Sequence, residues 1–442
     1  MRVLLRFLPA RLRARLENSA TLRNILPNTG WLLADRVLRM VVSLVVSVWV
    51  ARYLGPEAFG RFNFAIAFVV LFAPLGVFGL ERIAVRELVR SPGESGVILG
   101  SAFALRLAGG GLGALLAIGT MALLRRGDGE MLAMVAILSG GMLVQAFDVV
   151  DHWNQSRLQA RASVLAMSAG FLAAAALRLV LILNHAPLIA FAWAWAAELV
   201  LGSLGLALSH RLREGARTAW RASGPRITSL ARDGWLLLLS SVMVSVYTRV
   251  DQVMLGLMSN PAELGAYAVA VKLVEVWYFL PAAIVTSVFP SIVESRRLGD
   301  DVFYDRLQRL YNLMAAISFA VAIPVTFLAP WVVRFLFGEE YARAAPMLTV
   351  LVWSLPFTSL GLARGAFLST MNWNGAYLMT VAAGCVANVG LNLLLIPRFG
   401  GMGAVIASCL AYWMAAHGAC FLYRPLFRTG GMLTRALLPR RF

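Results

Sequence analysis

Residues 40–80 read MVVSLVVSVWVARYLGPEAFGRFNFAIAFVVLFAPLGVFGL. This stretch consists of two apolar runs joined by a short polar turn, RYLGPEAFGR, at residues 52–61. An apolar run of about 20 residues has the length of an α-helix that crosses a bilayer. Because the turn is too short to fold alone, the stretch predicts two consecutive membrane-spanning helices.

The same pattern continues along the chain. Of its 442 residues, 60% are hydrophobic and 14% charged, against roughly 45–50% and about 25% in soluble domains. About twelve apolar windows fit, at 30–53, 62–80, 96–124, 131–151, 162–183, 187–209, 234–258, 265–289, 311–337, 344–371, 375–396 and 401–423. The joints between them are too short for a soluble catalytic domain. The sequence predicts an all-α polytopic membrane protein of about twelve transmembrane helices.

The longest joint divides these windows six and six. We predict a basic cytoplasmic N-terminal arm (1–29), a six-helix lobe (30–209), a basic cytoplasmic inter-lobe loop (210–233), a second six-helix lobe (234–423) and a basic cytoplasmic tail (424–442).

The turns after the first and seventh windows resemble each other. Pro56 and Gly60 are followed by Phe62, and Pro261 and Gly265 by Tyr267. A duplicated six-helix unit re-enters the membrane in the same orientation, which gives a parallel pseudo-two-fold repeat with a central cavity between the lobes. Chance recurrence of Pro-x-x-x-Gly is the alternative reading.

The basic excess follows the predicted topology. The chain has 40 Lys and Arg against 22 Asp and Glu. Roughly 26 of these cations fall in the termini and even-numbered loops, about 6 in odd-numbered loops and about 8 within the windows. This distribution predicts cytoplasmic termini in a bacterial inner membrane, with positive loops facing anionic lipids. It does not indicate a nucleic-acid partner.

Charged residues inside the second predicted lobe are candidates for function. Arg249, Asp251, Lys272 and Glu275 fall at similar depth in helices seven and eight. Lys272 and Glu275 are three residues apart and share a face, whereas Arg249 and Asp251 are two apart and point in different directions. Lys272 is the only lysine in the chain, which suggests a compact point charge or a titratable group.

The first predicted lobe holds Asp35, Arg39, Arg106 and Glu198 within its windows. Such charges are costly in lipid. Cations outnumber acids within the windows, because Arg36, Arg178, Arg334 and Arg364 also lie there, so we expect an electropositive cavity and an anionic substrate. The expected substrate-binding groups are Arg249, Lys272, Arg39 and Arg106. The expected charge partners or coupling groups are Asp251, Glu275, Asp35 and Glu198. The alternative is that these residues only pair with one another and hold helices together.

Other polar residues are weaker candidates. Arg178 lies near a helix end and is expected to snorkel, and Arg364 is an intermediate case. Asp148, Asp151 and His152 have metal-ligand residue types but read better as one solvated helix end, so no metal or cofactor is expected. The three cysteines lie in predicted helices and read as core residues: Cys385, Cys409 and Cys420.

The order of several short motifs resembles the polysaccharide biosynthesis, or oligosaccharide flippase, family of the MATE-like multidrug/oligosaccharidyl-lipid/polysaccharide exporter superfamily. The motifs are Arg52-x-Leu54-Gly55-Pro56-Glu57-x-Phe59-Gly60-x-Phe62, Gly79-Leu80, Arg86-Glu87, Arg249-x-Asp251, Leu255-Gly256, Gly265-x-Tyr267, Phe289-Pro290, Phe337-Gly338-x-x-Tyr341 and Ile396-Pro397-x-Phe399-Gly400-x-x-Gly403-Ala404.

The resemblance implies a two-lobed, alternating-access transporter of polyprenyl-pyrophosphate-linked oligosaccharides, driven by a proton or sodium gradient. A polysaccharide polymerase and other assembly proteins are implied as partners. The runner-up is a cation-coupled multidrug antiporter of the same superfamily, for which an acidic cavity would be expected. A membrane polysaccharide polymerase or ligase is a third alternative, but it should carry a sizeable outer loop.

The charge distribution leads to a first test. Reporter fusions after residues 56, 262 and 340 should report a periplasmic location, and fusions after 220, 300 and 435 a cytoplasmic one, because basic loops stay in the cytoplasm. Alkaline phosphatase and fluorescent-protein fusions measure this. A periplasmic signal at 220 would contradict the arrangement of six plus six helices.

Overall fold

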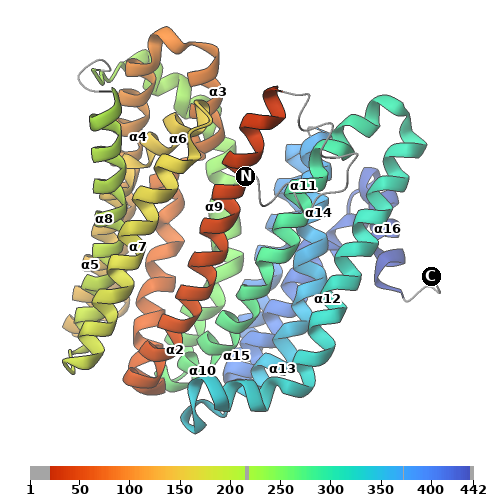
Figure 1. Ribbon diagram of the computed structural model, residues 1–442. Coiled ribbons are helices and arrows are strands. Elements are labelled where there is room, and N and C mark those ends of the chain that lie inside the picture. Colours follow the sequence, from red (N-terminus) through yellow and green to blue (C-terminus); the bar gives the residue numbers. More distant parts are fainter. Residues whose placement is uncertain (1–19, 215–218, 372, 439–442) are drawn as a thin grey trace. The chain divides into compact units, whose positions relative to one another are not determined.

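A computed structural model describes residues 20–214, 219–371 and 373–438, which form helices and no strand. Figure 1 shows their arrangement. The α-helices are α2 (Ala20–Val77), α3 (Leu80–Arg90), α4 (Ser95–Leu124), α5 (Gly129–Val144), α6 (Val149–Ser156), α7 (Ala160–Leu183), α8 (Leu188–Glu214), α9 (Gly224–Met258), α10 (Pro261–Glu275), α11 (Phe279–Ser295), α12 (Asp300–Phe337), α13 (Ala344–Leu351), α14 (Leu355–Thr370), α15 (Asn374–Ala416) and α16 (Phe427–Leu437). Most of the predicted N-terminal arm, residues 1–19, lies outside the described residues.

The chain is a multi-pass membrane protein. Within the described residues, ten helices are long and apolar enough to cross a membrane. Two of these spans, Asp35–Arg90 and Asn374–Ala416, contain 56 and 43 residues. At about 1.5 Å per residue, each would be roughly two to three times as long as the hydrocarbon core is thick. The predicted count of twelve requires both to cross twice, and it stays a prediction.

Both long spans are interrupted by a glycine. Gly55 in α2 has φ 69° and ψ 171°, and Gly400 in α15 has φ 55° and ψ −131°, so neither residue is helical. A positive φ is open to glycine at no steric cost and is unfavourable for residues with a Cβ. These glycines mark the breaks that the sequence analysis placed between separate windows, at 54–61 and 397–400.

The structure divides into two compact units. Of the described residues, unit 1 comprises those within 20–43 and 72–238, and unit 2 comprises those within 44–71 and 239–438. The chain therefore changes unit twice within α2 and once within α9. Residues 44–71, which the sequence analysis assigned to the first lobe, pack in the same unit as the second.

Unit 1 is built mainly from α4, α5, α7 and α8. Helix α7 packs along α8, α8 along α5, and α5 along α4, as Figure 1 shows. Glycines allow close approach, because a Cβ on Gly109 or Gly113 of α4 would meet the backbone carbonyl of Leu75 or Phe72. The glycine-rich stretch at 109–113 therefore serves close helix packing.

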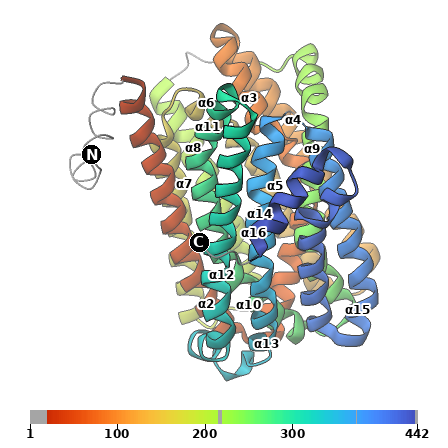
Figure 2. The same cartoon turned by 90° about the vertical axis from the view of Figure 1, so that its right-hand side faces the viewer.

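Unit 2 holds the C-terminal helices. Helix α12 packs against α13, α14 and α16, and α14 packs against α15 (Figure 2). A buried apolar cluster joins Phe303 and Leu307 of α12 to Phe367 of α14 and Leu433 of α16. The tail predicted as 424–442 thus contains a helix whose apolar residues belong to the core of the unit.

The two related turns meet inside unit 2. A Cβ built on Gly60 would overlap the backbone carbonyl of Pro261, and a Cβ built on Gly265 would overlap that of Pro56. Each glycine therefore lies against the proline of the other turn. The contact is reciprocal, as a two-fold axis between the turns requires, which supports the repeat reading over chance recurrence.

Two further contacts hold the first turn. The Arg52 guanidinium donates to the carbonyl oxygens of Leu336 at 2.7 Å and Phe335 at 2.5 Å, at the C-terminal end of α12. The Tyr341 hydroxyl donates to the carbonyl oxygen of Ala51 at 2.8 Å. Burial raises the pKa of Tyr341 above its ordinary value, so the hydroxyl stays a donor. The turns predicted on one side of the membrane, near residues 56, 262 and 340, thus share one end of unit 2.

Candidate functional site

The strongest candidate site lies in unit 2 around Arg249 and Glu275. Nη2 of Arg249 on α9 lies 3.0 Å from Oε1 of Glu275 on α10, and each side chain is 31% exposed. The sequence analysis placed these residues at similar depth, and the structure brings them together.

Asp251 has different partners from Arg249, as the two-residue spacing predicted. Its side chain is buried, at 2% exposure. The carboxylate accepts hydrogen bonds from the hydroxyl groups of Tyr267 and Ser408, the latter at 2.8 Å, and from the backbone N–H of Gln252 at 2.7 Å. A buried carboxylate held by neutral donors is a candidate for binding a proton or a small cation.

Lys272 is half-buried on α10, three residues before Glu275. It lies seven residues after Gly265, which is nearly two full helical turns. Lys272 therefore shares the face of α10 that Gly265 presents to the turn at 56–60.

In unit 1, Asp35 and Arg39 form a local pair on α2. Nε of Arg39 lies 3.0 Å from Oδ1 of Asp35, and the Ser168 hydroxyl of α7 also donates to Asp35. The Arg39 guanidinium lies over the ring of Phe171, 5.0 Å from its centroid. The side chains of Arg39 and Asp35 are 27% and 19% exposed. Each can therefore still be reached by another charged group.

Arg106 is almost fully buried in unit 1. It donates to the carboxylate of Asp148 at 2.9 Å and to the carbonyl oxygen of Gln145 at 2.9 Å, and its Nη1 lies 3.4 Å from Nε2 of His152. His152 is 4% exposed. The interpretation of Asp148 and His152 as a solvated helix end is therefore wrong, because Arg106 and His152 are buried together.

Glu198 also has a partner in unit 1. Its Oε2 lies 2.7 Å from Nη2 of Arg178, with side-chain exposures of 24% and 13%. Arg178, which was expected to snorkel, pairs with Glu198 on α8 and is largely buried. This pair joins α7 to α8.

Arg364 is the charged residue whose environment the sequence analysis foresaw least. It is 2% exposed and donates to the Ala416 carbonyl at 3.0 Å, to the Cys420 sulfur at 3.2 Å and to the Thr380 hydroxyl at 2.8 Å. Ala416 is the last residue of α15, where the helix dipole is negative. From Tyr341 to the end of the chain there is no Asp or Glu, a signal that Arg364 would need a backbone partner.

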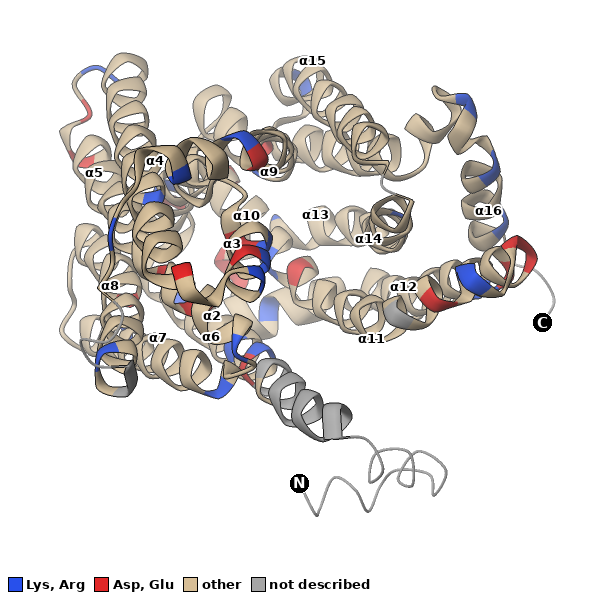
Figure 3. Ribbon diagram, turned by 90° about the horizontal axis from the view of Figure 1, so that it is seen from above, with Lys and Arg blue, Asp and Glu red and all other residues tan. Residues whose placement is uncertain are grey.

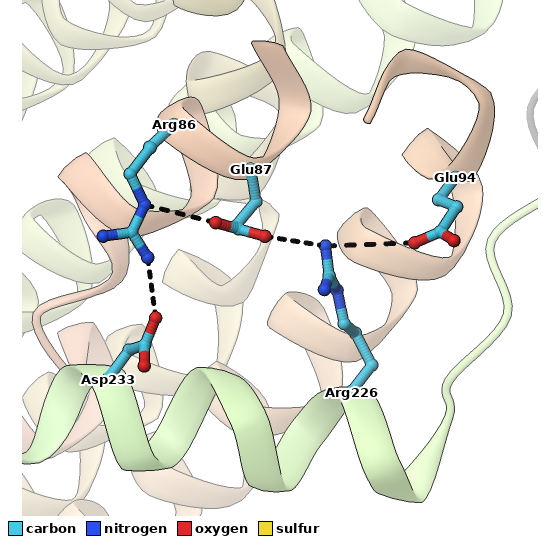
Figure 4. A network of polar contacts seen from close by, with 5 residues as sticks. All are labelled: Arg86, Glu87, Glu94, Arg226 and Asp233. Atoms are coloured by element: carbon cyan, nitrogen blue, oxygen red, sulfur yellow. Dashed lines mark hydrogen bonds and ion pairs between the residues drawn. The ribbon is translucent and has the colours of Figure 1, made fainter. Parts of the chain in front are cut away.

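A surface network fixes the start of α9 on unit 1 (Figure 4). Arg86 of α3 contacts Asp233 of α9 at 2.6 Å and Glu87 at 3.2 Å, and Arg226 of α9 contacts Glu87 at 3.0 Å and Glu94 at 4.0 Å. The Arg86–Asp233 pair is 48% and 44% exposed, and a pair as exposed as this contributes little by itself. Together these contacts stabilise the first turns of α9, a segment that the sequence analysis treated as part of the loop 210–233.

The four predicted substrate-binding cations divide evenly between the units. Arg39 and Arg106 lie in unit 1, and Arg249 and Lys272 lie in unit 2. Seen from the end that carries α3, charged positions of both signs lie on α3, whereas α16 carries only basic ones (Figure 3). Arg39, Arg106 and Arg249 each pair with an acidic residue of their own unit.

The comparisons with known proteins point to transporters. Residues 25–296 match the family model described as "Polysaccharide biosynthesis protein", and residues 237–394 match the MatE model. Two proteins of Haloferax volcanii are similar in sequence. "Probable flippase AglR" is 24% identical over 389 residues, covering 85% of this chain and 78% of the relative. "Probable low-salt glycan biosynthesis flippase Agl15" is 22% identical over 177 residues, which span only 37% of that relative.

Solved structures of transporters share the fold. An inward-facing multidrug resistance MATE family transporter of the MOP superfamily aligns with a TM-score of 0.73 at 17% identity, covering 90% of this chain and 95% of the other. The lipid II flippase MurJ in an inward closed conformation aligns with a TM-score of 0.71 at 12% identity, covering 92% and 90%. At these identities the likeness concerns the fold alone.

The Arg249–Glu275 pair can be tested by a double-mutant cycle. Arg249→Ala should lower stability by about 1–3 kcal/mol, because it leaves a half-buried carboxylate unpaired. Adding Glu275→Ala should recover part of the loss. The measurement is thermal unfolding in a bilayer mimetic. The control pair is Arg309 and Asp305, which is 78% and 58% exposed; equal losses at both pairs would contradict the assignment.

Arg364 allows a second stability test. Arg364→Met should cost about 2–4 kcal/mol, because the Ala416 carbonyl and the Thr380 hydroxyl lose a buried donor. The matched control is Arg398→Met, since Arg398 is exposed and donates to the Leu394 carbonyl of its own helix. Protein abundance and melting temperature report the difference. A loss no larger than that of the control would show that Arg364 does not cap α15.

Proposed function

Because the chain belongs to the polysaccharide biosynthesis protein family, whose model matches residues 25–296, we propose that it is a flippase for lipid-linked oligosaccharides. It moves polyprenyl-pyrophosphate-linked repeat units from the cytoplasmic to the periplasmic leaflet of the inner membrane. The observation that carries this proposal is the family match together with relatives named as flippases. The transporter fold of the solved structures is consistent with it.

The charges within the spans support an anionic substrate. A pyrophosphate cannot cross about 30 Å of hydrocarbon without compensating charge. Arg39, Arg106, Arg249 and Lys272 supply such charge at four points, and guanidinium groups bind phosphate through paired hydrogen bonds. In this proposal, Glu275 and Asp35 occupy Arg249 and Arg39 while no substrate is bound. The pyrophosphate then replaces the carboxylates.

Asp251 is the proposed coupling group. A carboxyl group that loses or gains a proton, or binds sodium, changes the charge of its site by one unit. Its partners Tyr267 and Ser408 lie on α10 and α15. Occupation of Asp251 would therefore change how α9, α10 and α15 are held together, which gives an ion gradient a route to the conformation of the lobes.

A second candidate function is multidrug antiport. The MatE model matches residues 237–394, and the MATE transporter has the same fold. Cationic drugs need a site with excess acid, whereas the predicted site residues contain as many cations as acids and the chain is acid-free beyond Glu340. We therefore keep antiport as the alternative and glycan flipping as the proposal.

The proposed transport cycle is alternating access by rocking of two six-helix lobes around a central site. Both termini are cytoplasmic in this proposal. A polysaccharide polymerase in the same membrane would take up the flipped repeat unit.

The experiment is a reconstituted transport assay. Purified protein in liposomes should flip a fluorescent polyprenyl-pyrophosphate glycan without nucleotide and faster under a proton or sodium gradient. Arg249→Gln and Lys272→Gln should each slow flipping by about tenfold or more, as expected for loss of one charge-assisted contact. Asp251→Asn should abolish the response to the gradient. Arg309→Gln, at an exposed position, is the control and should flip normally.

Three outcomes would contradict the proposal. These are dependence on added ATP, normal flipping by both cation variants, and efflux of a cationic dye in place of glycan transport. Abundance measured beside transport separates a lost binding site from a lost fold.

A further inference from the structure

All ten tyrosines of the chain lie in unit 2, and unit 1 has none. Three of them lie around Arg249. They are Tyr247 on α9, Tyr278 in a short 3-10 helix between α10 and α11, and Tyr412 on α15. Tyr278 and Tyr412 both interact electrostatically with Arg249. The rings of Tyr247 and Tyr412 meet edge to face, with their centroids 5.4 Å apart. Three separate elements thus bring aromatic hydroxyl groups to one cation.

The position of Tyr278 follows from the turn that carries it. The 3-10 helix Val276–Tyr278 has Glu275 as its N-cap. In a 3-10 helix, side chains three residues apart lie directly above one another, so Tyr278 lies on the same side as Glu275. Because Glu275 pairs with Arg249, the turn places Tyr278 beside the same cation.

The depth of Tyr247 and Tyr412 is not that of membrane anchors, which lie at the membrane surface. Tyr247 precedes Met258, the last residue of α9, by 11 positions, and Tyr412 follows the break at Gly400 by 12. Met258 and Gly400 lie at one end of the unit, since a Cβ on Gly400 would meet Glu263 in the first turn of α10. At about 1.5 Å per residue, both tyrosines lie roughly 17 Å from that end, near mid-membrane.

Filling of an apolar core does not require these hydroxyl groups. A phenylalanine fills such space as well as a tyrosine and brings no hydroxyl that needs a partner. Unit 1 packs in this way where Phe103 contacts Phe147 and Trp220. In unit 2, Tyr311 and Tyr341 are fully buried, but the three tyrosines around Arg249 are only half-buried. Part of each of their side chains is therefore open to a ligand.

The surroundings of these tyrosines are polar. Arg249 and Glu275 are each 31% exposed. Charged side chains deep in a membrane protein face its interior or water and avoid lipid. The open side of Tyr247, Tyr278 and Tyr412, next to this ion pair, therefore suits a polar ligand.

The chemistry of the proposed substrate fits this arrangement. Its first sugar is bonded directly to the pyrophosphate, so a cation that holds the phosphate places that sugar against the neighbouring side chains. A sugar ring has C–H groups on its faces and hydroxyl groups at its edge. Tyrosine matches both, because its ring packs against C–H groups and its hydroxyl donates and accepts hydrogen bonds.

We propose that Tyr247, Tyr278 and Tyr412 form a subsite for the sugar ring next to the pyrophosphate, while Arg249 holds the phosphate. The inference rests on the proposed transport of lipid-linked oligosaccharides. It divides recognition in unit 2 between two kinds of group. The cation binds any lipid pyrophosphate, and the tyrosines distinguish one that carries a sugar from one that does not.

The test compares polyprenyl pyrophosphate carrying one sugar with the same lipid pyrophosphate without sugar. Binding of each fluorescently labelled lipid to purified protein in nanodiscs gives a Kd. Tyr247→Phe, Tyr278→Phe and Tyr412→Phe keep the ring and remove only the hydroxyl. Each should raise the Kd of the sugar-bearing lipid about fivefold, as expected for one lost hydrogen bond. The Kd of the sugar-free lipid should stay unchanged.

Two further variants serve as references. Tyr304 is also a half-buried tyrosine of unit 2 beside an arginine, since the Arg428 guanidinium lies 3.4 Å from its ring centroid. Tyr304→Phe should leave the Kd of both lipids unchanged. Arg249→Gln should weaken the binding of both lipids alike, because both carry the pyrophosphate.

Equal weakening of both lipids by the tyrosine variants would overturn the subsite, because the tyrosines would then act only by holding Arg249. Unchanged binding of the sugar-bearing lipid in all three variants would overturn it too. Thermal unfolding shows whether each variant is folded, and the folded ones decide the question. Sugar-dependent binding without flipping in liposomes would refute the proposed function and leave the subsite standing, whereas wild-type protein that binds neither lipid would refute both.

Discussion

Hydrocarbon offers a peptide group no hydrogen-bond partner, and the rest of this structure depends on that constraint. A helix satisfies the hydrogen bonds of its own backbone groups, which explains why the described residues form helices and no strand. Where a helix stops, something else must serve its free carbonyls. Arg52 does so at the end of α12 and Arg364 at the end of α15. The breaks at Gly55 and Gly400 occur where two apolar windows join, away from the middle of either.

The same lack of solvent acts on charged side chains. Arg249 with Glu275, Arg178 with Glu198, and Arg106 with Asp148 are each paired within one unit. Pairing lowers the cost of keeping charge in a membrane, but it also occupies the groups that a substrate would need. Asp251 differs, because hydroxyl groups and a backbone amide hold it. A group held by neutral donors can change charge without first breaking an ion pair, and for this reason we propose Asp251 as the coupling residue.

Hydropathy was enough to predict the fold class, because a long apolar run has one stable outcome in lipid. Depth along the helices also predicted that Arg249 and Glu275 meet. Depth could not predict that Arg178 reaches Glu198, since this depends on which helices are neighbours. Nor could it predict the burial of His152 or the division of the chain within α2, because packing between distant segments decides both. The ends of helices were the least predictable. Helix α9 already begins at Gly224, because its first turns form ion pairs with charged residues of α3.

The meeting of the two turns connects the repeat to the packing of unit 2. When a duplicated segment contacts its own copy, each residue at the contact has an equivalent on the other side, so one glycine in each copy gives two close approaches. Gly60 against Pro261 and Gly265 against Pro56 are this pair. A Cβ at either glycine would overlap the backbone of the other turn. The crossing therefore needs glycine in both copies.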